Sequence, residues 1–174
     1  MIGLELLLTN AVTSMLTKGD IAPLALPFRD ERGNEHTLAE YAGSWIVVYF
    51  YPKDNTPGCT IEAEGFRDME PDLTKEGVHI LGVSKDTCAS HVSFIEKKAL
   101  TFTLVADEDH ALMDAFGVWG ERRFMGRTYM GASRSTFIID PSGTVLHVWE
   151  KVRPIGHAKE VLAMVRTLKE VKGK

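Results

Sequence analysis

The fold is decided by residues 45–59, which read Trp45-Ile46-Val47-Val48-Tyr49-Phe50-Tyr51 and then Pro52-Lys53-Asp54-Asn55-Thr56-Pro57-Gly58-Cys59. The first part is an unbroken run of β-branched and aromatic side chains, typical of a strand buried on both faces of a partly parallel sheet. We expect this strand over 44–51, ending at the proline, and a helix over 59–75. The stretch therefore predicts a buried strand, a tight loop and a helix at the centre of the fold.

The rest of the chain continues with alternating strand and helix patterns. Because such alternation needs crossover connections, the inner strands are expected to be parallel, and a terminal hairpin at Pro141-Ser142-Gly143 adds an antiparallel edge. The pattern predicts a thioredoxin-like α/β fold, with a central mixed sheet flanked by helices. Strands are expected at 78–84, 103–105, 134–140 and 145–151, and helices at 88–98, 108–116 and 157–171.

Two segments lie outside this alternation. Residues 25–38 carry a polar tip between two apolar ends, which predicts an N-terminal β-hairpin closed at Gly33. Residues 117–131 contain repeated glycines and predict a long irregular loop inside the domain.

The composition is that of a soluble globular protein, with 44% hydrophobic and 25% charged residues in a chain of 174. These values argue against disordered, fibrous and membrane-spanning classes, and no stretch reaches the ~20 apolar residues of a membrane span. A net charge of −4 provides no general attraction to nucleic acid. The length suits one domain, which we expect over 17–174.

The first 16 residues are apolar but lack the pattern of a signal peptide. Glu5 interrupts them, and no Lys or Arg precedes Lys18. We interpret residues 1–16 as an N-terminal extension; a misassigned start codon is equally consistent with the sequence.

Two cysteines, Cys59 and Cys88, are too few for a secreted disulfide framework or a thiolate metal cluster. They indicate a reducing compartment, and we expect a cytoplasmic protein. The six histidines have no metal-ligand spacing and the carboxylates suggest no ligand cluster, so no metal is predicted.

Cys59 is the first candidate for chemistry. In open α/β sheets ligands bind beyond the carboxyl ends of the strands, and Cys59 lies in the loop that follows the most hydrophobic strand. A cysteine in the first turn of a helix faces unpaired N–H groups and the positive end of the helix dipole, both of which stabilise a thiolate. The alternative interpretation is a small buried hydrophobic residue.

The motifs of the chain match a known family. Pro52, Thr56 and Cys59 fit the peroxiredoxin pattern Pro-x-x-x-Thr-x-x-Cys, and Arg134 fits its distant arginine. The chain therefore resembles the peroxiredoxins, and among them the bacterioferritin comigratory protein subfamily, also called peroxiredoxin Q. The resemblance extends over residues 16–169. Supporting matches are Gly19-Asp20-Ile21-Ala22-Pro23, Gly82-Val83-Ser84-Lys85-Asp86 and Gly117-Val118-Trp119-Gly120.

The resemblance implies a role for each matching residue. Cys59 is implied to be the peroxidatic cysteine, whose thiolate attacks a peroxide oxygen and becomes a sulfenic acid. Thr56 is expected to place its hydroxyl beside the sulfur and bind the peroxide, and Pro52 to shield the thiolate from water. Arg134 is expected to stabilise the thiolate and the charge that develops on the peroxide. Glu62 occupies a carboxylate position typical of the subfamily, with no assigned role.

The resemblance also implies the reaction partners. The substrates are expected to be hydrogen peroxide and organic hydroperoxides, and the reductant thioredoxin or another thiol, in antioxidant defence. No cofactor is expected, because a thiolate reduces peroxide without one. A monomer or weak homodimer is expected, with no membrane or nucleic acid partner.

The resolving cysteine is the main departure from the subfamily. The two positions where relatives carry it are occupied here by Glu64 and Ile95. Cys88 is the one internal candidate, and it can bridge to Cys59 only if the two strand-end loops meet or the first helix partly unwinds. A one-cysteine mechanism with an external thiol and an intermolecular disulfide remain open.

Other functional classes fit the sequence less well than peroxide reduction does. A thioredoxin-type disulfide reductase needs a second cysteine at position 56, where this chain has Thr56. A glutathione-peroxidase type fits the loop and Arg134 less well. A thiol-based redox sensor or holdase-like interaction protein stays as the alternative, and differs from an enzyme in having no catalytic turnover.

Overall fold

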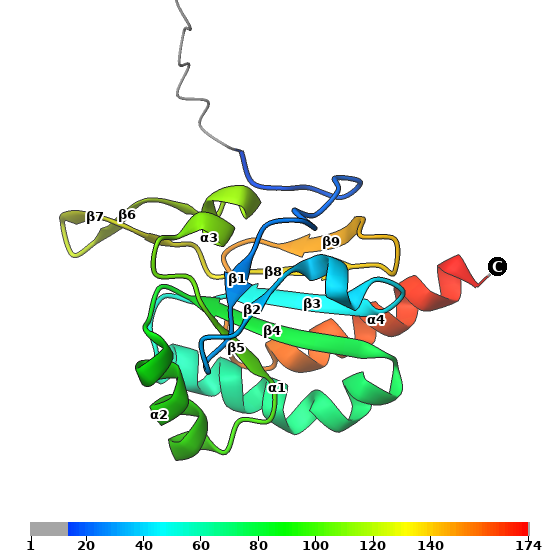
Figure 1. The fold of residues 1–174 in the computed structure, drawn as a ribbon, viewed down its shortest axis with the longest axis horizontal. Helices are drawn as coiled ribbons and strands as arrows, with labels where there is room; N and C mark the ends of the chain where they lie inside the picture. The colour runs from blue at the N-terminus through cyan, green and yellow to red at the C-terminus, as the bar shows by residue number, and fades with distance from the viewer. Residues whose placement is uncertain (1–13, 174) are drawn as a thin grey trace, which may run out of the picture.

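The computed structural model describes residues 14–173. Its centre is a five-stranded mixed sheet in the order β5-β4-β3-β8-β9 (Figure 1). β3 pairs in parallel with β4 and antiparallel with β8, so the expected mixed sheet is confirmed. The strands are β3 (Trp45–Phe50), β4 (Val78–Ser84), β5 (Thr103–Ala106), β8 (Ser135–Ile139) and β9 (Val145–Trp149).

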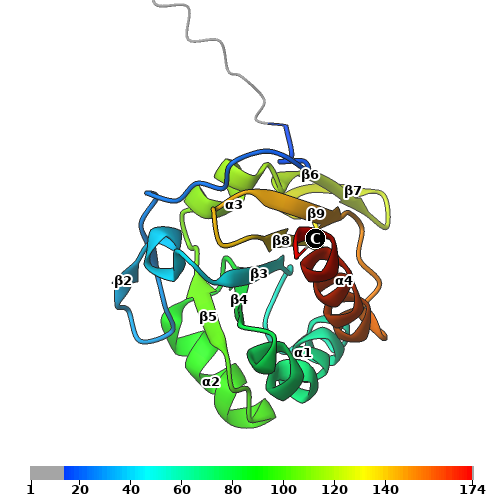
Figure 2. The same ribbon diagram turned by 90° about the vertical axis from the view of Figure 1, so that its right-hand side faces the viewer.

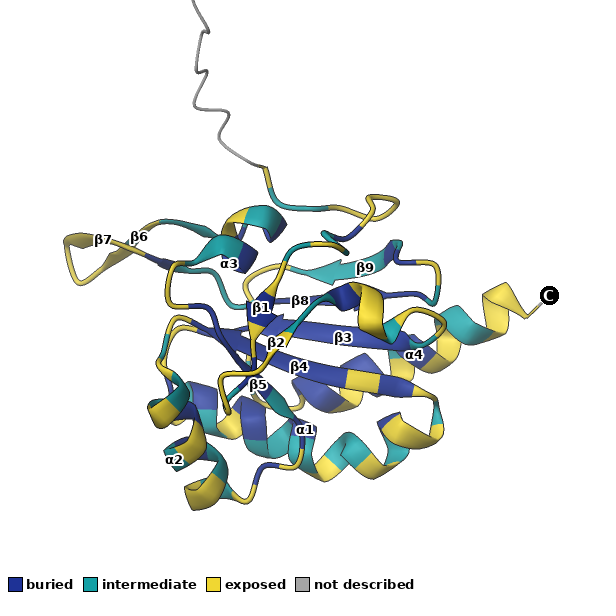
Figure 3. Cartoon of the chain, in the orientation of Figure 1, coloured by how far each residue is buried: buried dark blue, intermediate teal, exposed yellow. Residues whose placement is uncertain are grey.

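Every residue of β3 is buried because both faces of the sheet are covered. Val47 and Tyr49 face the layer that contains α1 (Pro57–Lys75) and α4 (His157–Lys172). Val48 and Phe50 face the opposite core, which includes Leu38, Phe116 and the N-terminal segment. Figure 2 shows the two layers end-on, and Figure 3 shows the buried central strands between them. This double covering explains the unbroken apolar run.

The remaining helices are short or lie at the sheet edge. α2 (Cys88–Lys98) follows β4 and packs near β5, the edge strand. η1 (Leu38–Tyr41) and α3 (Ala111–Phe116) belong to the opposite layer. Within residues 14–173, the helices include none whose length and apolarity would allow it to cross a membrane.

The N-terminal hairpin is confirmed as β1 (Phe28–Arg29) paired with β2 (Glu35–His36). Most predicted boundaries agree with the structure to within two residues. The helix expected from 108 begins at Ala111, and the helix expected from 59 already begins at Pro57, where the ring is tolerated because the first N–H has no helical partner. Only β9 of the terminal hairpin is an edge strand, since β8 pairs with β3.

The irregular loop predicted at 117–131 is wrong, because this segment forms a β-hairpin. β6 (Trp119–Phe124) pairs with β7 (Arg127–Ala132), and the turn residues Met125 and Gly126 both have positive φ, as a two-residue hairpin turn requires. The hairpin projects from the body and most of its residues are exposed (Figure 3). Since neither face is fully buried, the sequence has no apolar alternation to reveal the strands.

The N-terminal extension predicted at 1–16 lies outside the described residues except for 14–16. In that short part, the Leu16 N–H donates to the Phe116 carbonyl.

Candidate active site

Cys59 lies in the first turn of α1, directly after the central strand. Thr56 is the N-cap residue, Pro57 is the first helical residue, and the Thr56 carbonyl accepts the first helical hydrogen bond from the Thr60 N–H at 2.9 Å. The N–H groups of this turn have no helical acceptor, so their partial positive charge is available to an anion. Cys59 is buried, with 1% of its surface exposed. The sulfur therefore lies at the positive end of the α1 dipole, within the first helical turn.

Arg134 contacts both acidic groups of the site. Its Nη2 donates to the Cys59 sulfur at 3.3 Å, and its Nη1 donates to Glu62 Oε1 at 3.0 Å. Arg134 reaches the site because β8 runs antiparallel to β3, with Ser135 paired to Phe50, so the residue before β8 lies beside the end of β3. The structure thus brings together three residues that the sequence proposed separately.

The charges of the three groups are coupled. Burial raises the pKa of Glu62 to about 7, against the opposing effect of Arg134. Burial also disfavours the charge on Arg134, but Glu62 and Cys59 outweigh it and raise the pKa of the guanidinium. Arg134 therefore stays cationic in a site that is largely closed to water.

Gly58 allows the close approach of Arg134. A Cβ atom at this position would lie 3.2 Å from Arg134 Nη2 and 3.6 Å from Pro154 Cγ. The Nη2 atom is the one that contacts the sulfur, so a side chain at position 58 would press on that contact. This role of Gly58 cannot be predicted from the local sequence, since it depends on a residue that is distant in the chain.

The structure places Thr56 and Pro52 in the same loop. The Thr56 hydroxyl donates to the Lys53 carbonyl at 2.8 Å, and among residues 14–173 no hydrogen bond joins it to the Cys59 sulfur. Because that O–H is already donated, the oxygen is free to accept a hydrogen bond from a ligand. Pro52 is exposed at the end of β3.

Cys88 points away from Cys59. It is the first residue of α2, and its sulfur contacts the Asp30 carbonyl at 3.5 Å. Asp30 bridges Val105 of β5, whereas the Cys59 sulfur faces Arg134 beside β8. β4 and β3 lie between β5 and β8, so three strand spacings of about 4.8 Å separate these two strands. The Cys88–Asp30 contact and the Cys59–Arg134 contact are therefore about 14 Å apart across the sheet. Both cysteines are free thiols, and a disulfide between them would need a large rearrangement.

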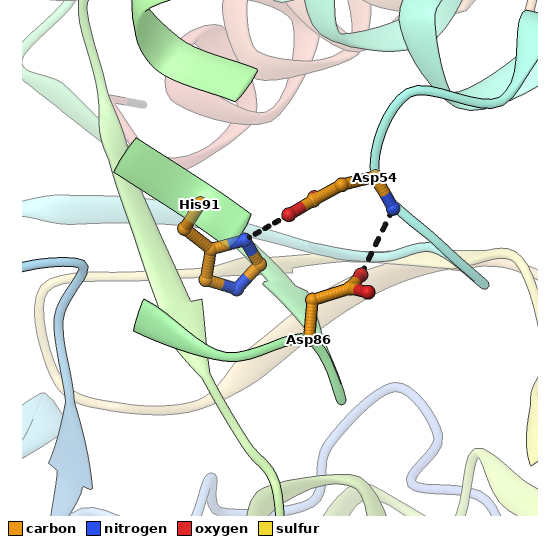
Figure 4. Close-up of side chains that lie close together, drawn as sticks. All are labelled: Asp54, Asp86 and His91. Atoms are coloured by element: carbon orange, nitrogen blue, oxygen red, sulfur yellow. Dashed lines mark hydrogen bonds and ion pairs between the residues drawn. The ribbon is translucent and has the colours of Figure 1, made fainter. Parts of the chain in front are cut away.

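A second polar cluster joins the Cys59 loop to α2 (Figure 4). The Asp54 carboxylate contacts His91 Nδ1 at 2.7 Å and accepts hydrogen bonds from Tyr51 and Ser90. The Asp54 N–H donates to Asp86 Oδ2 at 2.9 Å. The loops after β3 and β4 therefore meet through these polar groups, while Cys59 and Cys88 remain free thiols.

The cluster also has the composition of a metal site. One ligand atom each from Asp54, Asp86 and His91 lies within 4.8 Å of the others. Protein donors already occupy the carboxylates, however, and His91 Nε2 donates to the Val105 carbonyl at 2.9 Å. The cluster is better described as a hydrogen-bond network. The sequence did not reveal it, because its members come from separate segments.

The fold and the thiol site define a thiol-dependent peroxidase of the peroxiredoxin class. The AhpC/TSA family matches residues 19–148, and the chain belongs to that family. It is 46% identical to Peroxiredoxin Bcp of Escherichia coli K12 over 148 residues, which cover 84% of this chain and 94% of the relative. The resemblance stated from the motifs is confirmed.

Solved structures agree with this assignment. Peroxiredoxin Q of Xanthomonas campestris has a TM-score of 0.81 and 42% identity, covering 88% of this chain and 97% of its own. Peroxiredoxin 6 of Arenicola marina, at 22% identity and a TM-score of 0.79, covers 91% of this chain and 76% of its own and supports the fold alone. The thioredoxin-like fold is confirmed.

Proposed function

We propose that Cys59 is the nucleophile of this thiol-dependent peroxidase and that its substrates are hydrogen peroxide and small organic hydroperoxides. The observation that carries the proposal is the 3.3 Å contact between Arg134 Nη2 and the Cys59 sulfur at the start of α1. A buried thiol beside a fixed cation and a helix N-terminus is arranged to act as a nucleophile.

The site residues have complementary tasks in this reaction. The Cys59 thiolate attacks one peroxide oxygen, the S–O bond forms as the O–O bond breaks, and the sulfur becomes a sulfenic acid. Arg134 stabilises negative charge on the sulfur and then on the oxygens. The Thr56 hydroxyl donates its hydrogen bond to the Lys53 carbonyl, so its oxygen accepts a hydrogen bond from the O–H group of the peroxide. Pro52 covers the mouth of the loop.

Organic hydroperoxides are included among the proposed substrates because a related protein reduces alkyl peroxides. The bacterioferritin comigratory protein of Xanthomonas campestris is described as having alkyl peroxide reduction activity. At 42% identity, that relative supports the same substrate class for this chain.

We propose that an external thiol, thioredoxin or another, reduces the sulfenic acid directly. Peroxiredoxin Q of Xanthomonas campestris was solved with serine replacing cysteine at two positions 36 residues apart. At that distance from Cys59 this chain has Ile95. Cys88 faces the β1–β2 hairpin instead, so the one-cysteine route is favoured over an internal disulfide.

Intact mass spectrometry after one equivalent of hydrogen peroxide tests this route. We expect the protein to gain one oxygen atom, in a form trapped by a sulfenic-acid reagent, with the same result for Cys88→Ser. Loss of two hydrogens from the monomer, abolished by Cys88→Ser, would instead identify Cys88 as the resolving cysteine.

Peroxide turnover with a thiol reductant tests the function itself. Cys59→Ser is expected to be folded and inactive, and an active variant would contradict the assignment of the nucleophile. Oxidation once per molecule without cycling would instead favour a redox sensor.

We further propose a single domain over 17–174, a cytoplasmic location and a monomer or weak homodimer, supported by the free thiols and the compact sheet.

A further inference from the structure

Glu62 is a buried carboxyl group with one oxygen unaccounted for. Its side chain is 1% exposed, and Oε1 accepts a hydrogen bond from Arg134 Nη1 at 3.0 Å. Oε2 is buried and has no hydrogen-bond partner within the described part of the chain. An ionised carboxylate in such a place leaves one oxygen without compensation, whereas a protonated carboxyl carries no net charge.

Glu62 and Cys59 share one cation. Arg134 Nη1 and Nη2 belong to the same guanidinium, so Oε1 and the Cys59 sulfur flank a single positive charge. If both acids were ionised, two anions would be buried beside one cation. The site therefore favours one negative charge at a time, with one proton held by the pair.

The other titratable groups around Cys59 and Glu62 neither supply nor accept the proton that these two residues share. Tyr49 of β3 is a neutral phenol, because burial raises its pKa well above the usual value. Burial lowers the pKa of His157 of α4 to about 4, so its ring is neutral at pH 7. Asp54 is engaged with His91. Since burial raises the pKa of Glu62 to about 7, both of its protonation states are accessible near neutral pH.

We propose that Glu62 takes up the proton that Cys59 loses and then donates it to the leaving oxygen of the peroxide. This role rests on the proposed peroxidase function. In the reactive state Cys59 is a thiolate and Glu62 is protonated on Oε2, the oxygen that Arg134 leaves free.

The proposed step balances without another reactant. The thiolate electron pair attacks the terminal oxygen of ROOH, the S–O bond forms, and the O–O pair leaves on RO⁻. The Glu62 proton passes to RO⁻, which gives the alcohol ROH, the Cys59 sulfenic acid and the Glu62 carboxylate. The sulfur is oxidised, the peroxide is reduced, and Glu62 is a general acid.

The test compares two oxidants with different leaving groups. Attack on tert-butyl hydroperoxide expels tert-butoxide, which needs a proton, whereas attack on peracetic acid expels acetate, which does not. We expect Glu62→Gln to slow oxidation by tert-butyl hydroperoxide by about 10²-fold or more and oxidation by peracetic acid far less. Equal slowing of both reactions would mean that Glu62 only positions Arg134, and would overturn the proposal.

Glu64→Gln is the matched control. Glu64 is on the same helix, is partly exposed and lies 4.0 Å from Lys98 Nζ, so the same change there is expected to alter neither rate. Slowing in this control similar to that of Glu62→Gln would show that the effect is not specific to the site.

An infrared measurement on the wild-type protein tests the same proposal without depending on whether a variant folds. We expect the reduced protein at neutral pH to show the carbonyl band of a protonated carboxylic acid, which disappears after one equivalent of peroxide. A band that persists on oxidation would contradict the proton transfer. Failure of the peroxidase function is distinguishable, because the wild-type protein would then not form the sulfenic acid at all.

Discussion

Phe50 pairs with Ser135 across the antiparallel β3–β8 ladder, and this register determines where Arg134 lies. The residue that precedes Ser135 is carried to the end of β3, next to the first turn of α1. Arg134 therefore contacts the Cys59 sulfur although 75 residues separate them in the chain. A shift of one residue would turn the Arg134 side chain to the other face of the sheet.

Replacing Arg134 by alanine is expected to slow the reaction of Cys59 with peroxide by about 10²–10³-fold, because the charge that stabilises the sulfur and the oxygens is removed. The thiolate fraction at neutral pH is expected to fall as well. Stopped-flow kinetics and thiolate ultraviolet absorbance check the two effects. Arg123→Ala, on the exposed β6 strand, is the control and is expected to change neither. Unchanged thiolate absorbance in Arg134→Ala would contradict the assigned role.

Gly58→Ala is expected to lower peroxidase activity by up to about 10²-fold by displacing Arg134. The new Cβ would lie 3.2 Å from Arg134 Nη2, closer than an ordinary contact. Gly65→Ala is the matched control on the same helix, because its Cβ would meet Ala158 at an ordinary 3.5 Å. That variant is expected to keep full activity and to gain up to about 1 kcal/mol in the free energy of unfolding. Full activity in Gly58→Ala would show that Arg134 adapts freely.

Glu62 is expected to make the protein less stable as the pH rises. Its pKa is raised by burial from 4.5 to about 7, so the folded state binds more protons than the unfolded state between those values. The stabilising contribution is complete below about pH 4.5 and is lost as the pH rises to about 7, on the order of 3 kcal/mol. The free energy of unfolding of the wild type minus that of Glu62→Gln should fall across this window. A flat difference would mean that Glu62 is not buried in solution.

The free energy of unfolding must be compared between wild type and Glu62→Gln, because His157 changes the pH dependence of stability in the opposite direction. Burial lowers the pKa of His157 from 6.5 to about 4, so its contribution is present above pH 6.5 and is lost as the pH falls to about 4. The two slopes partly cancel in the wild type between about pH 4.5 and 6.5. His157→Gln is therefore expected to expose the falling stability that Glu62 causes.

His91→Ala is expected to lower the free energy of unfolding by about 3 kcal/mol or more, because the buried Asp54 carboxyl group would lose its histidine partner and a cavity would remain. The two side chains are 0% and 1% exposed and lie 2.7 Å apart. Denaturant unfolding checks the value, and hydrogen exchange over residues 52–59 should rise because the network ties this loop to α2. His79→Ala, an exposed site, should change stability by about 0.5 kcal/mol or less.

A double-mutant cycle separates the pair from general cavity effects. Combining Asp54→Ala with His91→Ala is expected to destabilise the protein by less than the sum of the single changes. Strict additivity would show that the contact does not couple the loop to α2.

Much of the fold could be predicted because its signals are local. The unbroken apolar run of β3 and the helical spacing of α2 depend on neighbours within a few residues. The same holds for Cys59, whose place in a first helical turn follows from the loop before it. The hairpin β6–β7 was missed because its two strands are exposed and carry no apolar alternation.

Only the tertiary structure decided how the candidate residues meet. The sequence by itself predicted a thioredoxin-like sheet and Cys59 as the candidate reactive thiol, and the family resemblance added Arg134 and Glu62 as candidates. The sequence did not determine that one guanidinium serves both acids, that Glu62 Oε2 lacks a partner, or that Cys88 faces Asp30. Strand register and burial depend on contacts between residues tens of positions apart. The periodicity of apolar residues indicates only which face of a single helix or strand is buried. The contacts of Arg134, Glu62 and Cys88 are therefore seen only in the folded structure.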